Sequence, residues 1–283
     1  MGIEPQNRME TTSPQEPAEV VPPLCQRPKR AGAEEGGTGE VPLFAGEPAW
    51  LTELARRRPD FVFMAPYLAY LLLLPLKDWV PAAYVPWATA ARGILGLAVF
   101  WFLRRHFPPL GKPHWPIAIT AGVLTVVLWV GGEHLLNRVY IGNFHVGGRL
   151  FVFPGVFEVK DPREGLTALS WASQVVLRLA VATITVPIVE EIFWRGFLLR
   201  AFINWDRFER VPLGAFAWRA FIGTALLSCL QHPDNWVVSI LCWLAWNGLM
   251  YWKKSLLCLM ITHGITNLVL YLYVIRAGDW QFW

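Results

Sequence analysis

The sequence predicts an all-α, polytopic transmembrane helix bundle of about seven to eight spans, preceded by a disordered N-terminal tail. Of the 283 residues, 54% are hydrophobic and only 16% are charged, whereas soluble domains carry about 25% charged residues. The 16 tryptophans agree with a membrane, because the amphipathic indole ring favours the boundary between lipid and water. These observations exclude a soluble globular fold.

Three regions follow one another along the chain. Residues 1–45 are rich in Pro, Glu, Gly and Thr, and such a segment buries too little apolar surface to offset the entropy of ordering it. It lacks the basic start and apolar run of a signal peptide. We expect transmembrane helices and a long loop in 46–160, and a second helix bundle, which carries the polar residues of interest, in 161–283.

Seven apolar segments form the predicted bundle, the fourth with an amphipathic lead-in at 165–175. They lie near residues 61–76, 87–103, 115–132, 176–199, 217–231, 236–252 and 256–275. Several are shorter than the roughly 20 residues that cross a bilayer, and flanking Trp and Tyr extend them into the interface. An alternative with eight spans divides the fourth segment at Pro187.

The distribution of basic residues predicts a cytoplasmic N-terminus. Arg56, Arg57 and Arg58 precede the first span, and with seven spans more of the flanking Lys and Arg residues fall on that side than on the other. Topology accounts for the net charge of +4, so we expect membrane lipid and no nucleic acid as a partner. The four cysteines have neither the spacing of a zinc site nor that of a disulfide framework.

Two adjacent glutamates mark the fourth segment. Ionisable residues inside a span are costly, so each needs a partner or a purpose. Glu191 and Arg195 are four residues apart on one helix face, with the acid first, which is the favourable order for an ion pair. Glu190 points about 100° away and lacks this partner. Helix–helix cohesion alone would explain the ion pair of Glu191 and Arg195. Glu190 has no such partner and is therefore available for chemistry.

Two further segments supply histidines and an amide. His263 and Asn267 are four residues apart on the last span and share a face, from which both can donate toward one oxyanion. His232, at the end of the fifth span, could orient or deprotonate a water beside Glu190. A buried structural histidine or an interfacial one is the alternative for each. Arg178 has no acid nearby in sequence, and we expect it to snorkel or to make a structural bond.

These residues together resemble the motifs of the CAAX-protease and bacteriocin-processing superfamily of intramembrane proteases. Glu190-Glu191 with Arg195 resembles its first motif, His232 falls where the second supplies a histidine, and His263 with Asn267 resembles the third. Ser228 and Trp194 stand where the family usually has Phe. The resemblance covers about residues 165–275, and Trp194 is similar to the residue in members associated with exosortase-type protein sorting.

The resemblance implies a glutamate-dependent endopeptidase. Glu190 and His232 would activate a water, His263 and Asn267 would hold the oxyanion, and Glu191 with Arg195 would position the helix. The substrate would be a membrane-associated protein or peptide, lipid-modified or part of a sorting system. The predicted tail and the short loops indicate a bacterial inner membrane as the location. No cofactor is implied. A divalent metal on the histidines and a glutamate ranks lower, because no His-Glu-x-x-His is present and Asn267 suits a hydrogen bond better.

Two non-proteolytic hypotheses stay open at this point. The same bundle could act as a membrane scaffold or immunity protein, in which case Glu190 is dispensable while the fold is not. It could also be a small transporter that uses Glu190 and the histidines as a proton relay, although no internal repeat supports this. One observation distinguishes the protease from the scaffold and the transporter. The protease requires that four residues converge on one cavity: Glu190, His232, His263 and Asn267.

Overall fold

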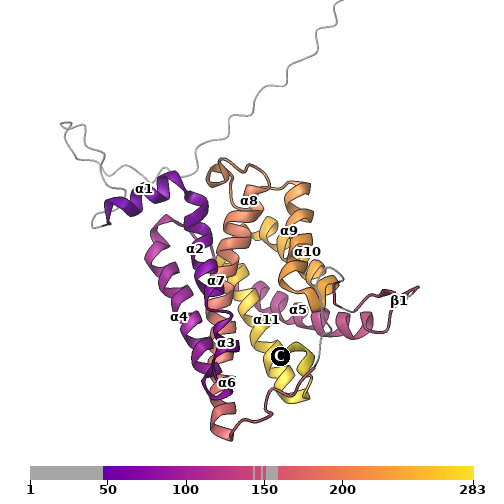
Figure 1. Cartoon of the computed structure of the whole chain (residues 1–283). Helices are drawn as coiled ribbons and strands as arrows, with labels where there is room; N and C mark the ends of the chain where they lie inside the picture. The colour runs from indigo at the N-terminus through magenta and orange to yellow at the C-terminus, as the bar shows by residue number, and fades with distance from the viewer. Residues whose placement is uncertain (1–46, 143, 148, 151–158) are drawn as a thin grey trace, which may run out of the picture. The chain divides into compact units, whose positions relative to one another are not determined.

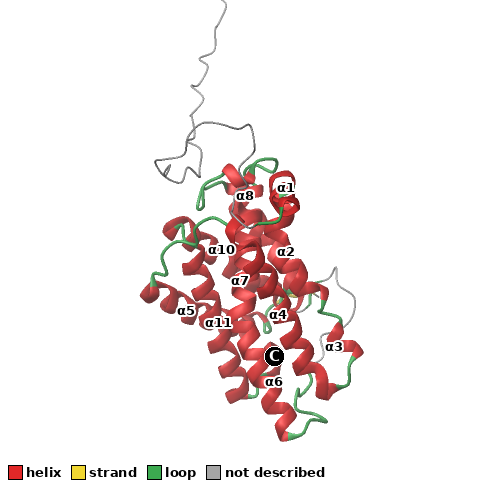
Figure 2. Ribbon diagram, turned by 90° about the vertical axis from the view of Figure 1, so that its left-hand side faces the viewer, coloured by secondary structure: helices red, strands yellow, loops and turns green. Residues whose placement is uncertain are grey.

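The structure, a computed structural model, describes residues 47–142, 144–147, 149–150 and 159–283. Most of this part of the chain is helical (Figures 1 and 2). The predicted tail, 1–45, lies outside the described residues. The principal helices are α1 (Ala49–Arg57), α2 (Pro59–Leu72), α3 (Leu76–Trp79), α4 (Val85–Leu103), α5 (Trp115–Leu136), α9 (Trp218–Gln231), α10 (Trp236–Lys253) and α11 (Leu256–Ala277).

Between α5 and α9 the chain forms one continuous helix from Ala168 to Ala201. Two π-helical stretches, η3 and η4, interrupt the α-helical winding of this helix. Its parts are α6 (Ala168–Ala180), η3 (Val181–Thr185), α7 (Val186–Glu191), η4 (Ile192–Leu198) and α8 (Leu199–Ala201). π-turns inside α-helices occur frequently at functional sites, and here they flank the two adjacent glutamates.

Short elements connect these helices. Single 3₁₀ turns lie at η1 (Ala82–Tyr84), η2 (Arg104–His106), η5 (Phe208–Arg210), η6 (Pro233–Asn235) and η7 (Trp280–Phe282). In the long loop after α5, β1 (Tyr140–Ile141) pairs antiparallel with β2 (Phe144–His145).

Helix packing places α11 at the centre of the bundle. It packs along α5 and against α7, while α10 packs on α9, and α4 lies between α2 and α6. In Figure 1, α2 and α4 stand beside the long helix that contains α6 and α7. The largest side chains with almost no exposure include Trp243, Arg195 and Glu191, so the polar cluster lies inside the core.

All seven predicted spans are helical, but they are not equal. In the described part of the chain, five helical segments are long and apolar enough to cross a membrane: 59–79, 82–106, 115–136, 168–201 and 256–277. α9 and α10 correspond to the fifth and sixth predicted spans and are not among them; α9 has only 14 residues. The protein is therefore an integral membrane protein, and its described residues contain fewer helices of full spanning length than the seven to eight spans expected.

Pro187 does not divide the fourth segment, contrary to the eight-span alternative. The N–H of Val186 bonds to the carbonyl of Val181, five residues back. In that register the partner of the Ala182 carbonyl would be residue 187, which is proline and has no N–H. Asn267 on α11 supplies the missing donor, since its Nδ2 lies 2.7 Å from the Ala182 oxygen. The proline thus creates a docking point for α11 within an unbroken helix.

Candidate active site

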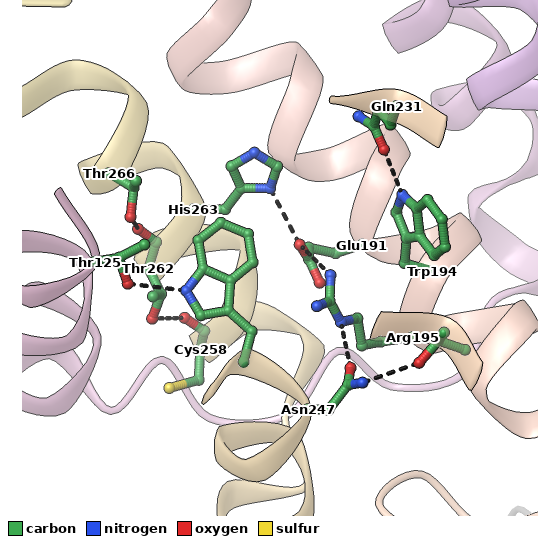
Figure 3. Close-up of polar contacts among 12 residues, drawn as sticks. Thr125, Glu191, Trp194, Arg195, Gln231, Asn247, Cys258, Thr262, His263 and Thr266 are labelled. Carbon is green, nitrogen blue, oxygen red and sulfur yellow. Dashed lines mark hydrogen bonds and ion pairs between the residues drawn. The ribbon is translucent and has the colours of Figure 1, made fainter. Parts of the chain in front are cut away.

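Glu191 is the centre of a buried charged network. Its Oε1 accepts hydrogen bonds from Nη1 of Arg195 at 3.2 Å and from Nδ1 of His263 at 3.1 Å (Figure 3). The side chains of Glu191 and Arg195 are 0% and 1% exposed. The ion pair expected from the sequence is present, and it also includes the histidine of the third motif.

Arg195 is held from a second side by residues that sequence reasoning missed. Its Nε donates to Oδ1 of Asn247 at 3.3 Å, and Nδ2 of Asn247 donates to Oγ1 of Thr224 at 2.9 Å. The guanidinium also lies over the rings of Trp243 and Trp246, with centroids 5.1 and 5.5 Å away. A polar Asn in the middle of an otherwise apolar segment was the available signal for this role.

Glu190 faces a different set of partners. It is 5% exposed and hydrogen-bonds the side chain of Gln231, the last residue of α9. The Gln231 Oε1 accepts in turn from the indole Nε1 of Trp194 at 3.0 Å (Figure 3). Trp194, the departure from the usual family motif, therefore fixes the amide that contacts Glu190. Sequence reasoning missed Gln231, although it directly precedes His232.

His232 lies just beyond α9 between two indole rings. Its ring centroid is 5.1 Å from that of Trp129, edge to face, and 5.6 Å from that of Trp243. Within the described part of the chain its imidazole makes no hydrogen bond with another side chain. Because the ring lines a cavity, both nitrogens are free to bind water.

Asn267 is anchored rather than free. One N–H of its amide bonds to the Ala182 carbonyl, which holds α11 against the π-turn η3 and leaves the second N–H for another acceptor. His263 is fixed by Glu191 at Nδ1 and stacks at 4.7 Å on Trp246. These two residues share one face of α11 as predicted, but each is already held in place by a bond to the helix that carries the glutamates.

The four predicted site residues line one cavity of about 330 Å³, to which Glu190, His232, His263 and Asn267 all contribute. A neighbouring cavity of about 260 Å³ shares His232, His263 and Asn267 but not Glu190. These volumes lie near the lower end of the range for ligand sites. The lining of the Glu190 cavity also includes arginine and tyrosine side chains.

The geometry offers limited support for a metal centre. Among the described residues, no three His, Cys, Asp or Glu side chains are grouped as a ligand set. The Glu191 oxygen that contacts His263 is also bound to the Arg195 guanidinium, a cation that opposes metal binding at this oxygen. The ranking of a metal below a water activated by side chains therefore stays a prediction.

The fold and the site together define a polytopic helical membrane protein with a polar cavity buried in its bundle. Residues 172–269 match the family model of type II CAAX prenyl endopeptidases, described as Rce1-like, so this part of the chain is similar to that family. The matched region runs from α6 into α11 and contains all six motif residues. No match was found among curated proteins or among solved structures.

The family match confirms the resemblance drawn from the motifs. It supports a CAAX-type intramembrane protease and hence a protein or peptide substrate. The helices α1 to α5 lie outside the matched region, yet α2 and α4 contribute Tyr70 and Arg92 to the cavity that holds Glu190. The site is therefore completed by parts of the chain that the family model does not cover.

Proposed function

We propose that this protein hydrolyses a peptide bond in a membrane-associated protein or peptide, using a water activated by Glu190 and His232. The observation that carries the proposal is the convergence of Glu190, His232, His263 and Asn267 on one cavity. The substrate segment would enter this cavity from the membrane or its boundary. Two carboxylates with separate partners give the site one acid for structure and one for catalysis.

The attacking water would lie between Glu190 and His232. A carboxylate shielded from bulk water is a strong base, and Glu190 takes the water proton as the oxygen attacks the scissile carbonyl. The tetrahedral intermediate then collapses, and the same proton passes to the departing amine. Gln231, held by Trp194, would keep the Glu190 carboxylate oriented between these two proton transfers.

His263 and Asn267 would stabilise the negative oxygen of the intermediate. Since Nδ1 of His263 faces the Glu191 carboxylate, it carries a proton, and donation from Nε2 requires the doubly protonated ring. Glu191 supports that charge from the other side. With Arg195 and His263 positive and both glutamates negative, the four groups sum to zero charge, which suits a buried site.

The finer assignments rest on the sequence. We place the N-terminus in the cytoplasm from the bias of basic residues around the spans. The N-terminal tail and the short loops of the sequence favour a bacterial inner membrane. A lipid-modified substrate, or one that belongs to an exosortase-type sorting system, follows from the motif resemblance. No cofactor is proposed, so chelation of divalent metals is expected to leave cleavage unchanged.

The decisive experiment compares Glu190→Gln with wild type in native membranes. New peptide termini, measured by mass spectrometry of whole membranes, are expected in wild type and should fall by about 10²- to 10⁴-fold in the variant, the usual contribution of a general base. Glu164→Gln, an exposed glutamate outside the site, is the matched control. Equal accumulation of all three proteins shows that the loss is chemical.

Two other outcomes identify the remaining hypotheses. Termini that persist in Glu190→Gln, or that are missing in wild type as well, contradict the protease and favour a scaffold or immunity role. A proton flux across vesicles that depends on Glu190, without new termini, favours the transporter. Repeating the assay with a strong zinc chelator tests the proposed independence from metal, and inhibition that added Zn²⁺ reverses would contradict it.

A further inference from the structure

Two arginines line the same cavity as the motif residues. Arg92 on α4 and Arg178 on α6 both line the cavity that contains Glu190. Each side chain is half-buried, and in each the Nε–H is buried and has no hydrogen-bond partner among the residues that the structure describes. Within the described residues neither guanidinium forms an ion pair with a carboxylate. Buried donors without a partner are costly, so these groups need an explanation.

Each arginine is positioned by a tyrosine. A guanidinium nitrogen of Arg92 donates to the hydroxyl of Tyr70, whose ring centroid is 4.4 Å from the guanidinium carbon. Nη2 of Arg178 donates to the hydroxyl of Tyr271 at 3.5 Å, and the Trp283 ring lies 4.5 Å from its guanidinium carbon. A guanidinium has five N–H donors, so both retain unused donors.

The charge in this cavity favours an anion. Three cationic side chains, Lys77, Arg92 and Arg178, line it against one carboxylate, that of Glu190. These four side chains sum to plus two, and the doubly protonated His263 of the proposed mechanism adds a further positive charge. The expected snorkelling of Arg178 does not explain why a second arginine from another helix lines the same space.

We propose that Arg92 and Arg178 form a subsite that binds a carboxylate of the peptide substrate while Glu190 and His232 act on the scissile bond. The inference rests on the proposed function, because it assigns further lining residues of the same cavity. Arginine matches a carboxylate with two parallel hydrogen bonds. The carboxylate is either the C-terminus of the substrate or an acidic side chain near the cleaved bond.

Binding of short probe peptides tests the subsite without any cleavage. The full-length protein, in phosphatidylcholine nanodiscs, is titrated with N-acetyl-trialanine as the free acid, with its C-terminal amide, and with N-acetyl-Ala-Asp-Ala amide. We expect the neutral amide to bind about tenfold or more weakly than the better carboxylate peptide, as for a hydrogen bond to a charged group. The carboxylate peptide that binds more tightly identifies the source of the charge.

Substitutions of the two arginines then show whether they cause the preference for a carboxylate. Arg92→Gln and Arg178→Gln should each remove most of the preference for a carboxylate, while Arg92→Lys and Arg178→Lys should retain part of it. Arg104→Gln is the matched control, because Arg104 stacks on Trp101 and donates to its backbone oxygen. The melting temperature of each variant shows whether it folds, and the Lys variants provide the test if a Gln variant does not.

Equal binding of all three peptides to wild type overturns the inference, and so does a preference that survives both Gln substitutions. Preferential binding of a short-chain phosphatidic acid over both carboxylate peptides, lost in the same variants, would replace the peptide subsite with a lipid one. Because binding is measured and not turnover, this test can fail while Glu190→Gln still abolishes cleavage, and the reverse also holds.

Discussion

Glu190 and Glu191 are neighbours in the chain but occupy opposite kinds of environment. Glu191 has no exposed surface and shares one oxygen between Arg195 and His263. Glu190 lines a cavity and meets a neutral amide, that of Gln231. A carboxylate fixed by two cationic or proton-donating partners is committed to structure, whereas one beside a cavity and a single neutral donor can exchange a proton.

The two surroundings also come from different helices. The Glu191 network joins α7 and η4 to α10 and α11 through Asn247 and His263. The Glu190 contacts run through Gln231 at the end of α9 and through Trp194. Substitutions can therefore disturb one environment without the other, and stability should respond mainly on the Glu191 side while activity responds on the Glu190 side.

The largest effect on stability is expected from Arg195→Met. It leaves Glu191 buried without its cationic partner, and breaking a buried ion pair in this way costs about 3–5 kcal/mol. The melting temperature and the yield of folded protein in detergent measure the loss. Arg163→Met, which removes an exposed ion pair with Asp161, should change neither. An Arg195→Met protein as stable as wild type would show that Glu191 is not committed to structure.

Gly264→Ala should have a smaller effect and test how Glu191 reaches its histidine. A Cβ at Gly264 would lie 2.7 Å from the backbone oxygen of Thr183, so α11 must move away from η3. This shift strains the Asn267–Ala182 and His263–Glu191 hydrogen bonds. Overpacking of this kind costs about 1–3 kcal/mol, and cleavage should fall with it.

Gly248→Ala provides the matched control for this substitution. Gly248 lies within α10, and a Cβ there meets nothing within 4 Å. Replacing a helical glycine with alanine at such a site is neutral or stabilises by up to about 1 kcal/mol. If the two variants have the same melting temperature and activity, the close approach of α11 to the π-turn does not hold the site together.

The sequence predicted the Glu191–Arg195 bond but not the other contacts of the two glutamates. The helical spacing of Glu191 and Arg195 was enough to expect their bond, because both residues belong to one segment. The bond from His263 to Glu191 joins residues 72 positions apart, and its geometry depends on how α11 docks. That docking depends on a π-turn and on Pro187, which the sequence suggested as a break between spans.

The residues that sequence reasoning missed share a physical cause. Gln231 and Asn247 are single polar groups in or at the end of apolar segments, and their partners come from other helices. Arg92 and Arg178 were separated by a loop and by α5, so only packing brings them to one cavity. The apolar pattern alone also does not distinguish a 14-residue helix such as α9 from a helix long enough to cross a membrane.

The smallest stability change is expected from Trp194→Phe, which affects only the Glu190 side. Phenylalanine is the residue usual at this motif position, and it keeps most of the packing against Phe193 and Trp243. It removes the indole donor to Gln231, a hydrogen bond worth about 1 kcal/mol. The freed amide can then turn away from Glu190, so the turnover rate should fall severalfold while the melting temperature shifts little.

Gln231→Leu separates the two possible explanations of such a loss. If Trp194 acts through Gln231, the double variant Trp194→Phe with Gln231→Leu should be no slower than Gln231→Leu alone, because the indole then has no amide to orient. Fully additive losses in turnover would instead show that Trp194 acts by packing. In that case the neutral amide beside Glu190 is not held by the indole, and the contrast between the two glutamates rests on the Glu191 network alone.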